Sequence, residues 1–304
     1  METVFVNDPS LPESGRFVRI FGVRRSGNHA IADFLGQRLH PDYLFLDQCR
    51  LPTNPLTSFN AVKFRNKVWS LNDKLISSDG KVITTREARS KVSDVLKCHV
   101  PLIAFFEEQI HARTLWRDKG HFHARAENVV VIRSLSNWLA SAFQHGKSYN
   151  PERQEDLALV GRLCALAETW LAHVEAARES AAAANVHVVK FDEFASSPAA
   201  RRALLDAMGI AADDLDLPAA SPFGRGSSFK NERVTPQQDI SKLGKRSKDL
   251  SDDPGYLRLL DIVFQDPRIR QAVLDEFPED RDRIEDLLGG MISGKRKSRL
   301  EAAS

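Results

Sequence analysis

Cysteine is scarce in this sequence. The 304 residues include three cysteines, Cys49, Cys98 and Cys164. Their number is odd, their spacings are wide and no CxxC pair occurs, which argues against a disulfide framework and against a zinc site built on thiolates. A reducing compartment fits this cysteine usage best.

Long apolar runs and an excess of one charge are missing too. No stretch approaches the roughly 18 uninterrupted apolar residues of a membrane span. Residues 1–17 lack the basic region and apolar run of a signal peptide. The formal net charge is only +2, which gives no sign of a nucleic-acid-binding protein. We therefore expect a cytoplasmic protein with no membrane span and no nucleic-acid partner.

Short runs of β-branched and apolar residues are present instead, at residues 17–23, 92–99, 128–133 and 186–191. The last two are nearly continuous in Val and Ile, as in strands buried on both faces of a parallel sheet. Helical patterns lie between and after these runs, at residues 30–39, 135–145, 152–184, 198–208, 254–265 and 267–288. The alternation predicts a three-layer α/β fold with a central parallel sheet and helices on both faces.

The length of the chain suits one large α/β domain. We expect a single domain over residues 1–293, followed by a basic, flexible tail over residues 294–304. Residues 47–90 are mixed and polar, and they predict an irregular insertion. Residues 218–255 are rich in Gly, Ser, Lys and Pro, and they predict a long loop region within the domain.

A glycine-containing turn at residues 22–29, GVRRSGNH, follows the first run and precedes a helix. Such a turn places backbone N–H groups around an anion at the positive end of the helix dipole, and its arginines and serine add charge and donors. A Walker A sequence would have Lys and then Ser or Thr after Gly27, whereas this chain has Asn28 and His29. We therefore expect a P-loop-like phosphate site that needs no metal. The alternative is a tight turn with solvated arginines.

A second candidate site combines Arg133 and Ser141. Arg133 would lie at the carboxyl end of a central strand, where ligands bind in open α/β sheets. Ser141 follows eight residues later, about two turns into the next helix. Both could reach one anion if the helix begins after a short loop that folds back. A surface ion pair and a helical filler are the alternatives.

Histidines supply a third candidate site. Residues 97–101, KCHVP, end the second run, and Lys97 and His99 point to the same face of a strand. An ammonium and an imidazole at a strand end can stabilise a developing charge and accept a proton, although a lone histidine can equally be structural. His121 and His123 form the only pattern that suggests a metal, and no nearby carboxylate or thiolate completes a ligand set.

In order, spacing and topology these motifs resemble those of the sulfotransferases that use 3′-phosphoadenosine 5′-phosphosulfate (PAPS). The 5′-phosphosulfate loop of that family reads roughly PKSGTTW, and residues 24–30 (RRSGNHA) occupy its place. Glycan-modifying members have a loop like GVRKGGTR, to which residues 22–29 are similar. The family's 3′-phosphate motif is an arginine followed by a serine eight residues on, and KCHVP resembles the cytosolic branch's KTHLP.

The resemblance implies a set of site residues. The cofactor-binding residues would be Arg24, Arg25, Ser26, Gly27, Asn28 and His29 at the 5′-phosphosulfate, Arg133 and Ser141 at the 3′-phosphate, Phe191 at the adenine, and Arg225 and Gly226 in a weakened RKG loop. His99 would be the catalytic base, with Lys97 and Arg25 stabilising charge. Arg25 replaces the family's lysine, so it cannot donate a proton as an amine might. Ala30 replaces the tryptophan that stacks on adenine in the cytosolic branch.

The resemblance thus implies in-line transfer of a sulfuryl group from PAPS to a hydroxyl or amine of a small-molecule or glycan acceptor, without a metal. One rival is a P-loop kinase, against which the missing Walker residues count. A second rival is a non-catalytic module that binds a polyanion through Arg24, Arg25 and the basic residues 225–248. The sequence names neither the acceptor nor the oligomeric state. A basic group could favour an acidic glycan or form a solvated face: Arg50, Lys63, Arg65 and Lys67.

Overall fold

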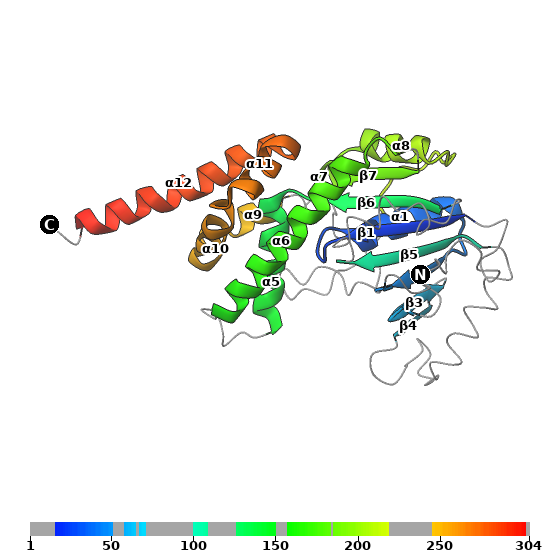
Figure 1. The fold of residues 1–304 in the computed structure, drawn as a ribbon, viewed down its shortest axis with the longest axis horizontal. Coiled ribbons are helices and arrows are strands. Elements are labelled where there is room, and N and C mark those ends of the chain that lie inside the picture. The colour runs from blue at the N-terminus through cyan, green and yellow to red at the C-terminus, as the bar shows by residue number, and fades with distance from the viewer. Residues whose placement is uncertain are drawn as a thin grey trace.

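The computed structural model describes residues 16–50, 58–64, 67–70, 100–108, 126–149, 157–183, 185–218 and 245–301. Within these ranges, strands form one sheet in the order β4-β3-β2-β5-β1-β6-β7 (Figure 1). The parallel strands are β2 (Leu44–Asp47), β5 (Leu102–Glu107), β1 (Phe17–Gly22), β6 (Ala126–Ile132) and β7 (Val186–Lys190). The antiparallel strands are β3 (Ala61–Phe64) and β4 (Lys67–Ser70).

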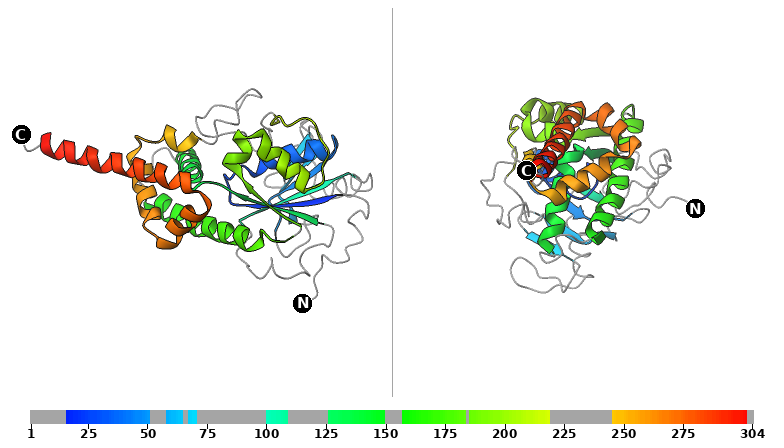
Figure 2. Two further views of the ribbon diagram at one scale, coloured as in Figure 1. Left: turned by 90° about the horizontal axis from the view of Figure 1, so that it is seen from above. Right: turned by 90° about the vertical axis from the view of Figure 1, so that its left-hand side faces the viewer.

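Helices cover both faces of this sheet. One face carries α1 (Asn28–Leu39), α7 (Phe191–Ser196) and α8 (Pro198–Ala207), and the other carries α6 (Leu157–Ser180). Figure 2 (left) shows the sheet edge-on between these two layers. Along β1, Val18 and Ile20 enter the core under α1, whereas Phe17 and Phe21 enter the core under α6. This two-residue alternation explains why every residue of β1 is buried.

The remaining helices lie beyond the carboxyl ends of the parallel strands (Figure 1). They are α5 (Leu135–Tyr149), α9 (Arg246–Asp249), α10 (Pro254–Phe264), α11 (Pro267–Glu276) and α12 (Pro278–Glu301). The side chain of Asp280 on α12 accepts hydrogen bonds from the backbone N–H and the hydroxyl of Ser136, in the first turn of α5. The hydroxyl of Tyr256 donates to the Ser136 carbonyl at 3.0 Å. The C-terminal helices therefore fix the start of α5.

The three-layer α/β prediction is confirmed, and the strands at 17–23, 128–133 and 186–191 are found as β1, β6 and β7. The central sheet is mixed rather than wholly parallel, because part of the segment 47–90 forms the antiparallel strands β3 and β4. Residues 92–99 lie outside the described ranges. Two parallel strands were not predicted at all: the four-residue β2, and β5, which lies directly beside β1.

Prolines mark helix boundaries that the pattern of apolar residues did not locate. Asp253, Asp266 and Ser197 each cap a helix that has proline in its first turn, and their side chains accept backbone N–H bonds. The predicted helix over 267–288 is two helices, because Pro278 cannot continue α11 and begins α12. α12 runs to Glu301, so the helix enters the segment 294–304, whose flexibility stays a prediction. None of the described helices is long and apolar enough to cross a membrane.

Candidate functional site

The turn between β1 and α1 lies at the carboxyl edge of the sheet. Its backbone is sharply bent: Ser26 N–H donates to the Val23 carbonyl at 3.2 Å, and Arg25 and Gly27 have φ angles of 70° and 94°. α1 begins without a side-chain cap and without an acidic residue in its first turn. The first N–H groups of a helix need acceptors, and the helix dipole favours a negative one. The predicted P-loop-like turn is thus present and shaped for an anion.

Gly22 and Gly27 are required by close contacts of this loop. A Cβ atom at Gly27 would lie 2.1 Å from the ring of Phe191, and one at Gly22 would lie 2.1 Å from Oδ1 of Asn28. The loop therefore rests directly on Phe191, which is fully buried. Since no part of its ring is exposed, Phe191 supports the loop from within the core, and this burial contradicts the adenine contact predicted for it.

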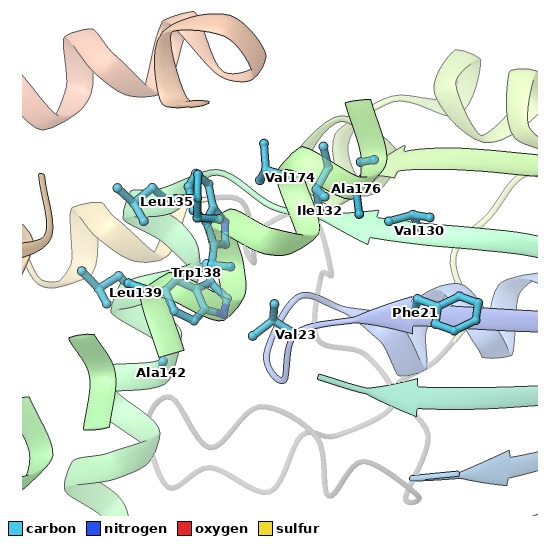
Figure 3. Packing of buried hydrophobic residues seen from close by; sticks show 14 of the residues in the cluster. Phe21, Val23, Val130, Ile132, Leu135, Trp138, Leu139, Ala142, Val174 and Ala176 are labelled. Atoms are coloured by element: carbon cyan, nitrogen blue, oxygen red, sulfur yellow. The ribbon is translucent and has the colours of Figure 1, made fainter. Parts of the chain in front are cut away.

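One side chain from α5 and one from the residue directly after β6 donate hydrogen bonds to carbonyl groups of the loop. The indole Nε1 of Trp138 donates to the Arg24 carbonyl at 3.0 Å, and Nη1 of Arg133 donates to the Arg25 carbonyl at 2.9 Å. Figure 3 shows Trp138 packed beside Val23, where β1 passes into the loop. These donors keep the loop in its bent form before any ligand arrives, so binding an anion needs little reorganisation.

Ser26 is a buried residue of the loop. Its side chain is 1% exposed, and its hydroxyl has no hydrogen-bond partner among the described residues. A buried hydroxyl without a partner costs roughly 1–3 kcal/mol. A phosphate oxygen at the start of α1 would supply the missing acceptor.

Two arginines contact Ser141, and neither is the Arg133 that the sequence paired with it. The Ser141 hydroxyl accepts from Nε of Arg25 at 3.4 Å and from Nη1 of Arg246, at the start of α9. Burial lowers the pKa of Arg246 well below its ordinary value, and the charges of Arg133 and Arg25 lower it further. Burial also lowers the pKa of Arg133, against the opposing charge of Asp192. Negative charge stabilises buried cations of this kind, and Asp192 supplies some of it to both arginines.

We name Arg25, Arg133, Ser141 and Arg246 the arginine cluster. Arg25 joins its first three members, because its side chain contacts Ser141 and its carbonyl accepts from Arg133. The sequence paired Arg133 with Ser141 at one phosphate, and that shared contact stays a prediction. Arg246 was missed, since the sequence offered only a general basic stretch at residues 225–248. Arg225 and Gly226 lie outside the described residues.

Asp192 fixes the orientation of Arg133. One of its carboxylate oxygens lies 3.4 Å from Nε of Arg133, and the other accepts from the backbone N–H of Ser134 at 3.1 Å and from the Ser134 hydroxyl. Arg133 is 1% exposed, so it is neither a solvated arginine nor a surface ion pair. It braces the loop and adds positive charge to the cluster.

His145, on α5, lies near the arginines of the loop. His145 lies one helical turn after Ser141, and burial together with the charges of Arg25 and Arg24 lowers the pKa of His145 to about 4. The imidazole is therefore neutral near pH 7. It adds a polar group but no charge to the surroundings of the arginine cluster.

Carboxylates lie on the opposite side of the loop, at the ends of β5 and β2. Glu107 ends β5 and is in register with Gly22, while the next residue, Glu108, donates its N–H to the Gly22 carbonyl at 3.1 Å and binds the Arg24 side chain. Burial raises the pKa of Glu107, and the charges of Glu108 and Asp47 add to this rise against the opposing charges of Arg24 and His29. Glu107 is thus a carboxylate whose basicity exceeds that of an ordinary glutamate.

Backbone strain gathers at the same edge. The non-glycine residues with positive φ in the described ranges are Arg25, Gln48 and Glu108, at 70°, 52° and 56°. They follow β1, β2 and β5, which are neighbours in the sheet. Such conformations are costly and concentrate at functional sites. The strain therefore supports a site at this edge.

His29 contacts a carboxylate in this structure, whereas the resemblance implied a phosphate contact. Its Nε2 lies 3.0 Å from Oδ1 of Asp47, the last residue of β2. Burial lowers the pKa of His29, but the hydrogen bond and charge of Asp47, with the charges of Asp33 and Glu107, outweigh it and raise the pKa above its ordinary value.

Lys97 and His99 lie outside the described residues, but the end of their motif does not. The Pro101 carbonyl accepts from the N–H of Leu44, and Leu102 is in register with Phe17 at the amino end of β1. Pro101, the last residue of the motif, therefore lies directly before β5 at the amino edge of the sheet, and the strand predicted over residues 92–99 stays a prediction. The length of β5, at about 3.3 Å per residue, separates that edge from the loop by roughly 16 Å.

No group of three or more histidine, cysteine or acidic side chains that could hold a metal occurs in the part of the chain that the structure describes.

Comparison with known proteins gave no matching family model and no matching curated protein. Solved structures do show similarity. A sulfotransferase domain from the Synechococcus PCC 7002 olefin synthase has 12% identity and a TM-score of 0.43, over 83% of this chain and 96% of that chain.

Two further solved structures are also similar. A sulfotransferase from Alicyclobacillus acidocaldarius has 14% identity and a TM-score of 0.42, over 90% of this chain and 96% of that chain. Mouse sulfotransferase SULT7A1, complexed with PAP, has 9% identity and a TM-score of 0.39, over 93% of this chain and 89% of that chain. The chain is thus similar to solved sulfotransferases, but at these low TM-scores its function has to be inferred from the residues of its own site.

Proposed function

We propose that the protein is a cytoplasmic sulfotransferase that uses PAPS as donor and a small molecule or glycan as acceptor. The observation that carries this proposal is the uncapped start of α1, where the buried Ser26 hydroxyl lacks a partner among the described residues and the arginine cluster lies alongside. This arrangement would bind two anionic groups of one ligand. The 5′-phosphosulfate would lie in the loop, and the 3′-phosphate would lie at Ser141 and Arg246.

Arg25 links the two anion positions. Its backbone belongs to the loop, while its side chain reaches the Ser141 hydroxyl. A nucleotide without a 3′-phosphate, such as ATP or AMP, would place no anion against Ser141 and Arg246. The requirement for a 3′-phosphate would thereby select PAPS over ATP and AMP. The arginines would supply the positive charge that a magnesium ion supplies in P-loop kinases.

The acceptor would bind on the carboxylate side of the loop, at the ends of β5 and β2. We propose Glu107 as the general base, in the role that the family resemblance gave to His99. Glu107 lies in register with the last residue of β1 and has a raised pKa, whereas Pro101, which ends the KCHVP motif, lies directly before β5 at the far edge of the sheet. Transfer would proceed in line, with Arg25 and the loop N–H groups stabilising the charge that develops on the leaving phosphate.

Incubation with ³⁵S-labelled PAPS and a panel of phenols, sugars and amines tests this function. We expect labelled product, or at least slow release of labelled sulfate to water, that is unaffected by a chelator of divalent metals. Magnesium-dependent transfer from ATP without transfer from PAPS would identify a kinase instead. Tight binding of heparin with no turnover of PAPS would identify a polyanion-binding module.

A further inference from the structure

We propose that His29 is a catalytic residue of this reaction, held by Asp47 as an imidazolium that lies against the sulfuryl group during transfer. This inference rests on the proposed function and deepens it. It adds a positive group on the acceptor side of the loop, where the arginine cluster does not extend. The loop residues alone suggested only that His29 would contact phosphate.

The position of His29 follows from the fold. It is the second residue of α1, directly after the loop, and its ring extends toward the end of β2. The ring is held edge to face by Phe45 and Phe105, with centroid distances of 5.7 and 5.8 Å. Both phenylalanines are buried. The imidazole is therefore fixed beside the anion-binding start of α1, with one nitrogen against Asp47.

The charges around His29 favour its protonated form. Among the described residues, Asp47 from β2, Asp33 from its own helix and Glu107 from β5 act on its titration, and all three are acidic. Asp33 is already engaged by the side chains of Lys63 and Tyr43. Lys63 therefore balances Asp33 rather than forming a basic face for an acidic glycan. Asp47 is 8% exposed, and an imidazolium is the cation that its carboxylate contacts.

Sulfuryl transfer beside His29 and Asp47 forms one bond to sulfur and breaks another. The acceptor oxygen forms a bond to sulfur, and the bond from sulfur to the bridging oxygen breaks. The bridging oxygen keeps that electron pair as part of the 5′-phosphate of adenosine 3′,5′-bisphosphate (PAP). The acceptor proton passes to the Glu107 carboxylate. His29 keeps its proton throughout and stabilises the negative charge of the sulfuryl oxygens.

This assignment predicts a bell-shaped pH profile. Transfer needs Glu107 ionised and His29 protonated, so activity rises with pH through the raised pKa of Glu107 and falls through the raised pKa of His29. Asp47→Asn removes the carboxylate that favours the imidazolium. The alkaline limb should therefore move to lower pH in this variant. If the pair only stabilised the fold, the limb would not move.

The test combines kinetics with a measurement on the protein alone. We expect His29→Asn to lower turnover of labelled PAPS on the order of 100-fold, with PAP affinity changed only a few-fold. Titration of the ¹⁵N-labelled imidazole by NMR should give a pKa above the ordinary value for His29, and a lower one in Asp47→Asn. His187→Asn is the matched control, since its Nε2 also contacts a carboxylate, Glu127, at 2.7 Å, but from the strand β7.

The outcomes separate the two proposals. Absence of both PAP binding and PAPS turnover in the wild-type protein would remove the proposed function and this inference with it. Normal PAP binding together with normal turnover in His29→Asn would overturn only the role of His29. If His29→Asn fails to fold, an unmoved alkaline limb and an unchanged His29 pKa in Asp47→Asn would overturn it equally.

Discussion

Glu107→Gln should lower sulfuryl transfer by roughly 100- to 10,000-fold, the usual contribution of a positioned general base. Glutamine fills the same space but cannot accept the acceptor's proton. Glu107 ends β5 beside Gly22, and its carboxylate accepts from Nε2 of Gln48 at 3.4 Å, a bond that the glutamine amide oxygen can still accept. PAP affinity should change little, because the arginine cluster lies on the other side of the loop. Steady-state rates and PAP calorimetry measure the two effects separately.

His99→Ala is the informative companion variant. The family resemblance makes His99 the base, whereas Pro101 and Leu102, which follow it closely in the chain, lie at the amino edge of the sheet. We therefore expect His99→Ala to keep nearly full activity. Loss of turnover in His99→Ala, with normal turnover in Glu107→Gln, would return the role of base to the histidine and contradict our assignment.

Arg246→Gln should weaken PAP binding by about 10- to 100-fold, since hydrogen bonds to charged groups contribute roughly 1.5–3 kcal/mol. Arg246 donates to the Ser141 hydroxyl and is buried beside Arg133 and Arg25, so a bound 3′-phosphate would add an opposing charge to it. The stabilisation that PAP adds to the melting temperature should shrink.

Arg268→Gln provides the control for this prediction. Arg268 is an exposed arginine of α11 that pairs with Asp266 and Glu168, both remote from the loop in the chain. Its replacement should leave PAP affinity unchanged. Unchanged affinity in Arg246→Gln as well would exclude Arg246 from the donor site and leave the 3′-phosphate to Arg133 and Ser141 alone.

Local patterns predicted the parts of the fold that depend on local physics. The Val-rich runs became β6 and β7, and the Ser-Pro and Asp-Pro pairs begin helices where capping chemistry requires it. The loop at residues 22–29 was predicted because its function depends on contiguous backbone. β5 was missed because KCHVP was interpreted as the end of a strand, so no second strand was expected directly after it. β2 was missed because four residues give too short a pattern.

The rest of the site depends on contacts between distant segments. Arg246 contacts Ser141 because α9 packs on α5, and no local pattern in the sequence predicts that contact. His29 meets Asp47 across the carboxyl edge of the sheet, so its partner follows from strand order rather than from spacing. Phe191 was assigned to adenine by position in a motif, yet the packing of Gly27 against its ring buries it.

Calorimetric titration of PAP into the purified protein, without metal and with AMP and ATP as controls, tests the central claim most directly. The arginine cluster and the start of α1 predict micromolar binding that requires the 3′-phosphate, so AMP should bind far more weakly. Absence of PAP binding, or binding of ATP only in the presence of magnesium, would contradict the proposed function.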